Sequence, residues 1–321
     1  MSVLRPRASV LALVAALGSL LLFSPAASAD QVLVADPSAD LLSAYGGSAA
    51  WSRIAGPGYR LVIRSDGRTE DARVRSFRHP VDVDLGPARR RGRTVAVYAR
   101  CKASLRDCDL FEYSLRDKRE RKLRSVSSRR RSEYAPSVWR GRYLFGRSGT
   151  GILKTGPLLR LTRRKPIDTD LRGNSALYSF FGADGPDAAT RRFGLRSRGR
   201  ECVVFESDFP SSGGFFTGVG RVAIDGDFQY WLQFGGTREF PVPNPPRPFH
   251  SVVRTRTPPA RCAPRSPQAT GVGIRPEGDG PPGEDDVTSF SISRGHLLYT
   301  DRGRGVVEVT PKATFGNFPL P

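Results

Sequence analysis

Four groups of acidic residues have types and spacings that could support acid–base chemistry. Carboxylates at alternate positions of an extended strand point to the same side of it, and two facing carboxylates are the usual apparatus of glycoside hydrolysis. Each group, however, stands just before or within a predicted turn, where aspartate favours turn initiation. We therefore interpret them as turn residues, with glycoside chemistry as the alternative. The groups are Asp82 with Asp84, Asp168 with Asp170, Asp225 with Asp227, and Glu201 with Glu206.

The three histidines, His79, His250 and His296, do not predict a hydrolase. His79 lies near Asp82 and Asp84 in sequence, so a base and a carboxylate that orients it could be assembled there. No serine or cysteine nucleophile accompanies it, and the Gly-x-Ser-x-Gly motif does not occur. His296 lies in a strand-like run, which favours a core or edge histidine. We predict no catalytic residue.

An acidic segment near the C-terminus could gather oxygen ligands around a calcium ion. It has no EF-hand spacing and contains two prolines, so we interpret it as a solvated loop and predict no metal and no cofactor. The acids in question are Glu277, Asp279, Glu284, Asp285 and Asp286.

Basic residues dominate the charge, with 51 lysines and arginines against 31 acids and a net charge of +20. Such a charge favours adsorption to anionic polymers or surfaces. Aromatic residues interleave sparsely with the basic runs, so nucleic-acid stacking is not predicted. Almost all the cations are arginines, as in the products of G- and C-rich genes, so solvated turns are the competing interpretation. The candidate anion-binding residues are Arg89, Arg90, Arg91, Arg129, Arg130 and Arg131.

Residues 1–29 have the three parts of a secretory signal: Arg5 and Arg7, an apolar run over 10–23, and small residues before Asp30. The apolar run is shorter than the roughly 20 residues of a membrane span. We expect an exported protein, secreted or associated with the cell envelope, that has no membrane span after cleavage and is monomeric.

Export permits disulfide bonds, and the four cysteines allow three pairings. Cys101 and Cys108 lie between two strand-like runs, where a bond would clamp the hairpin loop. Cys202 with Cys262 then follows by elimination. Neither pair has the tight spacing of a zinc knuckle.

The elements that must position these residues are strands. Helical periodicity is nearly absent after residue 29, and short runs rich in Val, Tyr, Phe, Leu and Trp alternate with Gly, Pro, Asp and Ser. Six of these runs share one plan, a glycine turn followed by an apolar strand, at spacings close to a propeller blade of about 40–50 residues. We predict an all-β chain, a β-propeller of four-stranded blades with six blades. It forms a single domain over 30–321, with an irregular Pro/Gly-rich excursion at 241–286.

Two segments resemble the WD40-like repeat of TolB-type β-propellers. Residues 136–149, "PSVWRGRYLFGRSG", resemble its first half, with a proline, an aromatic residue and a glycine turn before an apolar strand. Residues 108–123, "CDLFEYSLRDKRERKL", are similar to its second half. The usual Ser-Pro-Asp-Gly turn is replaced by Trp-Arg-Gly-Arg. Residues 45–148 also resemble secreted, functionally uncharacterised propeller-like proteins of actinobacteria.

A propeller presents its loops around a central channel, and function depends on those loops rather than on the fold. We expect an exported, non-catalytic binding or scaffold protein that engages an anionic cell-wall polymer or an envelope protein. The alternative is a secreted propeller hydrolase or lyase that acts on a polysaccharide.

Overall fold

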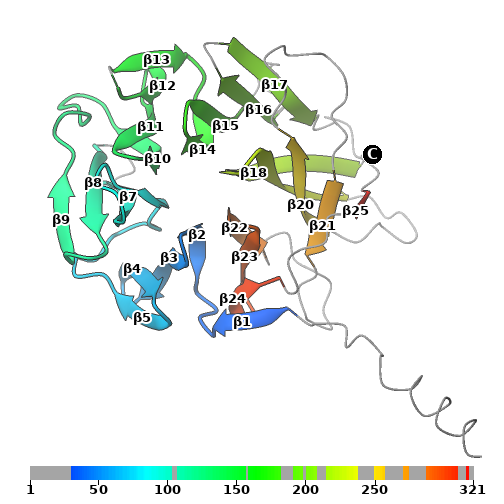
Figure 1. The fold of residues 1–321 in the computed structure, drawn as a ribbon, viewed down its shortest axis with the longest axis horizontal. Coiled ribbons are helices and arrows are strands. Elements are labelled where there is room, and N and C mark those ends of the chain that lie inside the picture. Colours follow the sequence, from blue (N-terminus) through cyan, green and yellow to red (C-terminus); the bar gives the residue numbers. More distant parts are fainter. Residues whose placement is uncertain are drawn as a thin grey trace, which may run out of the picture.

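The computed structural model describes residues 30–102, 107–156, 158–181, 191–197, 200–207, 215–237, 249–256, 270–274, 287–309 and 316–317. Over these ranges the chain forms strands and turns, with no helix that could cross a membrane. The strands make six antiparallel sheets arranged as blades around a central axis (Figure 1). This part of the chain is a β-propeller, as predicted.

The first three blades follow one another in the chain and pair their strands in sequence order. Blade 1 contains β2 (Asp40–Tyr45), β3 (Ser48–Ala55), β4 (Gly58–Ser65) and β5 (Arg68–Asp71). Blade 2 contains β6 (Val83–Pro87), β7 (Thr94–Arg100), β8 (Asp109–Ser114) and β9 (Arg119–Lys122). Blade 3 contains β10 (Glu133–Trp139), β11 (Arg142–Arg147), β12 (Gly151–Lys154) and β13 (Leu159–Thr162).

The last three blades include the two departures from a simple repeat. Blade 4 contains β14 (Pro166–Arg172), β15 (Ser175–Phe181), β16 (Arg191–Ser197) and β17 (Arg200–Ser207). Blade 5 contains β18 (Phe215–Asp225), β19 (Phe228–Thr237), β20 (Phe249–Arg256), β21 (Thr270–Ile274) and a fifth strand, β25 (Gly316–Asn317). Blade 6 contains β22 (Val287–Ser293), β23 (His296–Asp301), β24 (Gly305–Glu308) and β1 (Gln31–Val34).

The ring is closed by strands from opposite ends of the chain. β1 pairs antiparallel with β24, and Gln31 lies opposite Glu308. Because β1 supplies the outer strand of a blade whose other strands come last, blade 6 requires both ends of the described chain.

Two strands fall within the stretch predicted to be irregular. Residues 249–256 and 270–274 form β20 and β21, the third and fourth strands of blade 5. The prediction of irregular structure at 241–286 is wrong for these segments, because the surrounding prolines obscured a short strand pattern in the "FHSVVRTR" run.

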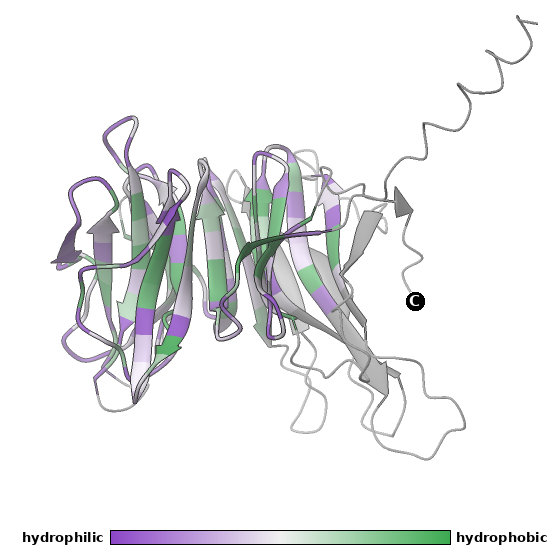
Figure 2. Ribbon diagram, turned by 90° about the horizontal axis from the view of Figure 1, so that it is seen from below, coloured by the Kyte–Doolittle hydropathy of each residue, from purple (hydrophilic) through white to green (hydrophobic). Residues whose placement is uncertain are grey.

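The core lies between blades, so a central strand is buried on both of its faces. On β7, Val95 and Val97 pack against blade 3, while Ala96 and Tyr98 pack against blade 1. This explains the continuous apolar run "VAVYA", since a strand covered on both faces needs no polar alternation. Figure 2 shows hydrophobic residues along the strands and hydrophilic residues in many of the turns at their ends.

The first, innermost strand of each blade lines the channel, and five of the six carry a bulge. The register shifts near the start of β2, β10, β14 and β22 and in the middle of β18, whereas β6 is regular. A bulge bends the strand and re-aims the side chains that follow it. In β14, for example, Asp168 and Asp170 follow the bulge and face the channel.

The ring has two faces. The innermost strand of every blade starts at one face and ends at the other. The hairpin face carries the turns that join the first and second strand of every blade, such as 46–47 and 140–141. The disulfide face, on the opposite side, carries the links into the innermost strands and the loop between β7 and β8.

Candidate functional site

The channel is lined by innermost strands that are each the edge of a sheet. Their inward amide groups have no partner within their own sheet, and a buried backbone amide needs an acceptor. Side chains of the neighbouring strand meet this need. Ser43 of β2 accepts a hydrogen bond from the Leu85 amide at 2.8 Å, and Asp84 of β6 accepts one from the Val138 amide at 2.8 Å.

The same type of contact joins the remaining blades, so the hydrogen bonds run around the whole ring. Thr169 donates to the Ala135 carbonyl at 2.7 Å and links blades 3 and 4. Blades 4 and 5, 5 and 6, and 6 and 1 are joined by amide hydrogen bonds from Val222 to Asp168, Gly295 to Asp225, and Leu42 to Ser289. We call this set the inter-blade ring.

The inter-blade ring changes the interpretation of the acidic pairs. Asp84, Asp168 and Asp170 lie within innermost strands and not in turns, which corrects the sequence-based interpretation. Their oxygens accept hydrogen bonds from neighbouring strands, and the Asp170 carboxylate accepts from the Ile224 amide. Asp227 does lie in the turn between β18 and β19. The side chains of Glu201 and Glu206 lie outside the described residues.

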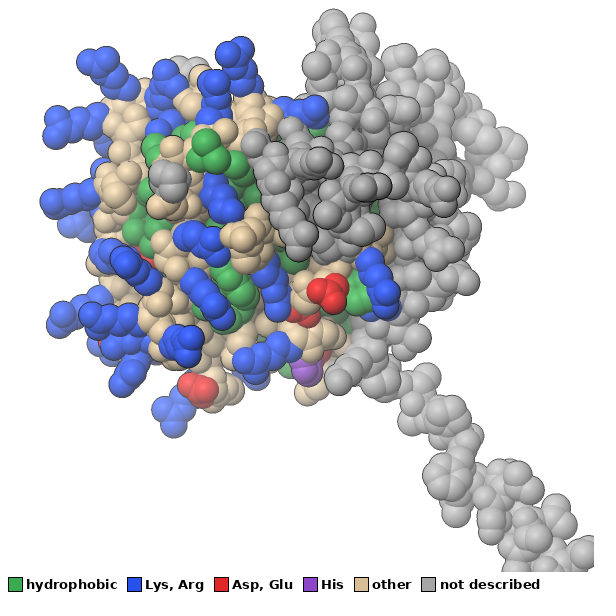
Figure 3. Space-filling model, turned by 45° about the horizontal axis from the view of Figure 1, so that its top comes forward, with side chains coloured by type: hydrophobic (Ala, Val, Ile, Leu, Met, Phe, Trp, Pro, Cys, Tyr) green, Lys and Arg blue, Asp and Glu red, His purple; other side chains and the backbone are tan. Residues whose placement is uncertain are grey.

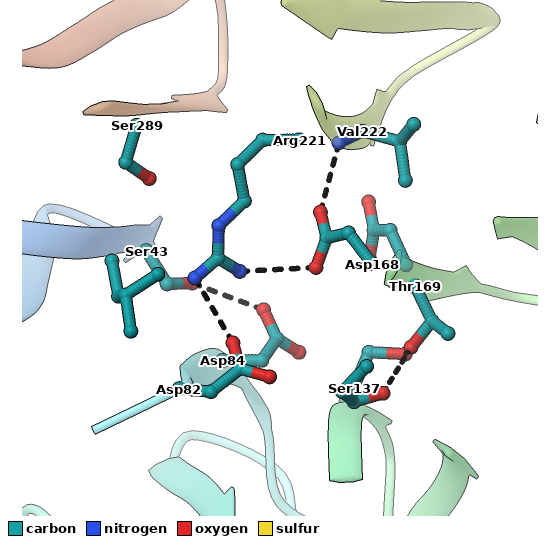
Figure 4. A network of polar contacts seen from close by, with 12 residues as sticks. Ser43, Asp82, Asp84, Ser137, Asp168, Thr169, Arg221, Val222 and Ser289 are labelled. Carbon is teal, nitrogen blue, oxygen red and sulfur yellow. Dashed lines mark hydrogen bonds and ion pairs between the residues drawn. The ribbon is translucent and has the colours of Figure 1, made fainter. Parts of the chain in front are cut away.

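Arg221 crosses the channel and joins three blades (Figure 4). It comes from the bulge of β18, and its guanidinium lies 3.0 Å from Asp168 of blade 4 and 2.9 Å from Asp82 of blade 2. Its side chain is only 13% exposed. Burial by itself would lower the pKa of Arg221, but Asp168 and Asp82 outweigh burial and raise it.

The channel carboxyl groups hold protons more tightly than free aspartates do. Burial raises the pKa of Asp168 to about 6, although Arg221 opposes this. Burial also raises the pKa of Asp170 to about 6. The pKa of Asp84 is raised well above its ordinary value, first by burial and then by the charge of Asp170. Negative charge in the channel is therefore only partly offset by Arg221.

At the hairpin face the channel ends in a cationic and aromatic mouth. The rings of Tyr45 and Trp139 meet edge to face at 6.0 Å, and the Arg172 guanidinium lies 5.3 Å from the centre of the Trp139 ring. Arg172 also forms an ion pair with Asp225. Arg294 lines the same cavity, which has a volume of about 100 Å³.

Two arginines at this mouth hold an unusual backbone conformation. Arg140 and Arg294 have φ of 51° and 54°, each followed by a glycine with positive φ. Two consecutive positive φ values make the type I′ hairpin turn, where asparagine or glycine is the usual first residue. A bulky residue in this region is strained, and backbone strain of this kind gathers at functional positions.

The predicted anion-binding residues fall on opposite faces. Arg89, Arg90 and Arg91 are exposed in the β6–β7 turn of the hairpin face, beside the Arg140–Gly141 turn. Arg129, Arg130 and Arg131 are exposed in the link before β10, on the disulfide face. They cannot form one site. Lysine and arginine side chains stand out over the described part of the surface in Figure 3, and few acids accompany them.

The other predicted residues have varied positions. Cys101 and Cys108 are disulfide-bonded, as predicted, whereas the Cys202–Cys262 pairing, residues 1–29 and the acids of 277–286 lie outside the described side chains. His296 is an exposed strand residue whose Nδ1 atom lies 2.6 Å from Glu308. His79 lines a cavity on the disulfide face that Asp82 also lines. The predicted bounds of the single domain and the monomeric state stay predictions.

Sequence reasoning missed Arg221 and the serines of the inter-blade ring. A signal was present, because polar residues alternate along the first strand of several repeats, as in Ser289, Ser291 and Ser293 of "SFSIS" or Asp168, Asp170 and Arg172 of "PIDTDLR". This alternation identifies a strand with one face on the channel, but it does not show which neighbour each side chain reaches.

Comparison with known proteins shows that the fold of this chain is similar to that of solved β-propellers, and it shows nothing about function. No protein family matches the sequence, and no curated protein matches it. Among solved structures, the chain is similar to TolB from Acinetobacter baumannii, with 14% identity and a TM-score of 0.47, over 84% of this chain and 65% of TolB. The chain thus spans just under two thirds of the length of TolB.

Two further similar structures have comparable scores. An oligogalacturonate lyase from Vibrio parahaemolyticus has 8% identity and a TM-score of 0.45, over 83% of this chain and 76% of the lyase. The WD40 domain of Toxoplasma gondii coronin has 10% identity and a TM-score of 0.39, over 90% of this chain and 85% of that domain. At these identities the likeness concerns the fold and carries no argument about activity.

Proposed function

We propose that this chain is an exported, non-catalytic binding protein whose hairpin face engages an anionic polymer of the cell envelope or extracellular space. The observation that carries the proposal is the mouth of the channel. Exposed arginines held in strained turns surround an aromatic pair there, while the nearby carboxylates are engaged in holding the blades together.

Arginine suits such a partner because its planar guanidinium pairs bidentately with carboxylate, phosphate or sulfate groups. Arg140 and Arg294 belong to blades 3 and 6, on opposite sides of the ring, and Arg89–Arg91 belong to blade 2. Cations spread around a ring match a ligand with repeated negative charges better than a single small anion.

The disulfide and the predicted leader support export. Disulfide bonds persist in oxidising compartments outside the cytosol, and Cys101 and Cys108 form one here. Mass spectrometry of the protein recovered from the culture medium or envelope is expected to give an N-terminus at Asp30. Recovery of the full-length chain from the cytosol would contradict this part of the proposal.

Co-sedimentation with isolated cell wall at increasing salt tests the binding proposal. Binding is expected to weaken as salt rises, because exposed charges are screened. Arg140→Asn with Arg294→Asn is expected to weaken binding severalfold without loss of thermal stability, since asparagine favours the type I′ turn. Arg124→Ala with Arg129→Ala removes the same charge from the disulfide face and is the matched control. Binding that does not depend on salt concentration would overturn the proposal. So would an equal loss of binding in the control variant.

The raised pKa values of Asp168 and Asp170 favour the alternative, a polysaccharide hydrolase or lyase, because catalytic acids are tuned in this way. Against it, both carboxylates accept amide hydrogen bonds from blade 5. Release of reducing or unsaturated sugar ends from an anionic polysaccharide, abolished in Asp168→Asn, would establish the enzyme instead.

A further inference from the structure

A second cavity lies on the disulfide face, away from the channel mouth discussed above. Its volume is about 670 Å³, within the range of roughly 300–1,000 Å³ of small-molecule sites. Its walls are the link before β6, the Cys101–Cys108 disulfide, the link before β10 and the start of blade 4. We call it the disulfide cavity.

Cations outnumber acids in the lining of the disulfide cavity, which includes Arg78, Arg130, Arg131 and Lys165 against Asp82 and Asp107. Arg130 and Arg131 come from the link before β10, and Lys165 comes from the residue before β14. Arg131 donates to the Thr150 hydroxyl. Arg130 and Lys165 are exposed and form no ion pair within the described part of the chain. Of the two lining acids, Asp82 is already paired with Arg221 at 2.9 Å, and Asp107 is an exposed residue of the disulfide loop. The cavity therefore has cationic groups available for an anion.

The remaining lining is largely apolar and includes aromatic rings. Phe77, in the link before β6, is buried and has the Arg100 guanidinium 4.7 Å from its ring centre, whereas the Tyr134 ring packs against Gly146 of β11. Burial raises the pKa of the Tyr134 hydroxyl to about 12. The Tyr134 ring and the neighbouring disulfide therefore provide an apolar surface for the ring of a ligand.

We propose that the disulfide cavity binds a small organic anion that carries an aromatic ring. Its acidic group pairs with Arg130, Arg131 and Lys165, and its ring lies against Tyr134 and the disulfide. This site is separate from the polymer surface on the hairpin face, and either could exist without the other.

Titration with 8-anilinonaphthalene-1-sulfonate, a fluorescent aromatic anion, tests the proposal. The triple variant Arg130→Ala, Arg131→Ala, Lys165→Ala is expected to raise the dissociation constant at least tenfold. The matched control removes the same charge from the hairpin face with Arg89→Ala, Arg90→Ala and Arg91→Ala, and is expected to bind as the wild type does. Equally weak dye binding in both variants would mean that only the net charge of the protein matters, and this would overturn the proposal.

Two further measurements keep the proposal testable if the triple variant does not fold. Benzoate is expected to displace the dye from the wild-type protein, and the neutral isostere benzamide is not. Photolabelling with 4-azidobenzoate is expected to mark the tryptic peptide 132–140, which contains Tyr134. Displacement by benzamide as strong as by benzoate, or labelling confined to peptides away from the cavity, would overturn the assignment.

Discussion

Asp84 occupies a place in the channel where an acceptor is needed but a negative charge is unfavourable. Its two oxygens receive hydrogen bonds from the Val138 amide and the Ser43 hydroxyl. Burial and the charge of Asp170 raise its pKa well above the ordinary value. Folding therefore favours a neutral group of the same shape at this position.

Asparagine should meet this requirement. Asp84→Asn is expected to leave the free energy of unfolding at pH 7.5 unchanged or increased, since its amide can accept from Val138 and donate to Ser43. Asp84→Ala leaves the buried Val138 amide without an acceptor and is expected to cost about 1–3 kcal/mol. Urea unfolding of both variants checks this. Equal destabilisation by asparagine and alanine would mean that the charge itself is required.

The channel aspartates also predict a pH dependence. The pKa of Asp168 and of Asp170 is about 6 in the folded chain, against an ordinary value of 3.8. The folded state therefore binds more protons between these values, and this stabilisation is lost as the pH rises through about 6. The melting temperature is expected to be higher at pH 5 than at pH 7.5, with a smaller difference in Asp84→Asn. A lower melting temperature at pH 5 would contradict this.

Arg221 is expected to be the residue of the channel least tolerant of replacement. Arg221→Met leaves Asp168 and Asp82 without their cation, and breaking a buried ion pair in this way costs about 3–5 kcal/mol. Denaturant unfolding is the measurement. The loss should shrink at pH 5, where Asp168 is protonated; a loss that does not depend on pH would point to packing rather than charge.

At the scale of elements, the sequence predicts strands better than it predicts their neighbours. The glycine turn and apolar strand recur often enough to give an all-β ring with the right number of blades. The partners of Ser43, Asp84 and Thr169, however, belong to other blades. A repeat pattern carries no information on which amide a polar side chain meets in the next repeat. The acidic pairs were therefore assigned to turns.

Turn packing between blades 2 and 3 offers a test at this scale. A Cβ atom at Gly141 would lie 2.8 Å from the Arg89 Cβ atom, whereas one at Gly226 would meet nothing within 4 Å. Both glycines have positive φ, so alanine is strained at either site. Gly141→Ala is expected to lower the melting temperature by several degrees more than Gly226→Ala. Equal effects would show that the blades 2 and 3 turns do not pack tightly.

For the whole molecule, the division of charge between faces and interior is the main feature. Cations outnumber acids on both exposed faces, and a separate group of carboxylates lies in the channel, where it joins the blades. This arrangement lets a protein of high positive charge keep a compact ring, because repulsion between exposed arginines is weak across solvent at physiological ionic strength.

Ring closure gives a prediction at this scale. Removal of residues 30–35 takes away β1 and exposes the edge of β24, so unfolding is expected to occur at lower urea and with a lower m-value. A synthetic peptide of residues 30–38 is expected to restore stability by strand addition. A scrambled peptide is the control. A truncated chain as stable as the intact one would show that β1 does not close the ring.

The pairing of β1 with β24 also sets the order of folding. β1 is made early during synthesis, yet its partner, Val306 to Glu308, is among the last described segments to be made. Blades 1 to 4 are contiguous in the chain and can form as it lengthens, but blade 6 cannot. The ring therefore becomes complete only after blade 6 has been synthesised. An exported chain built in this way would acquire its full stability on the far side of the membrane.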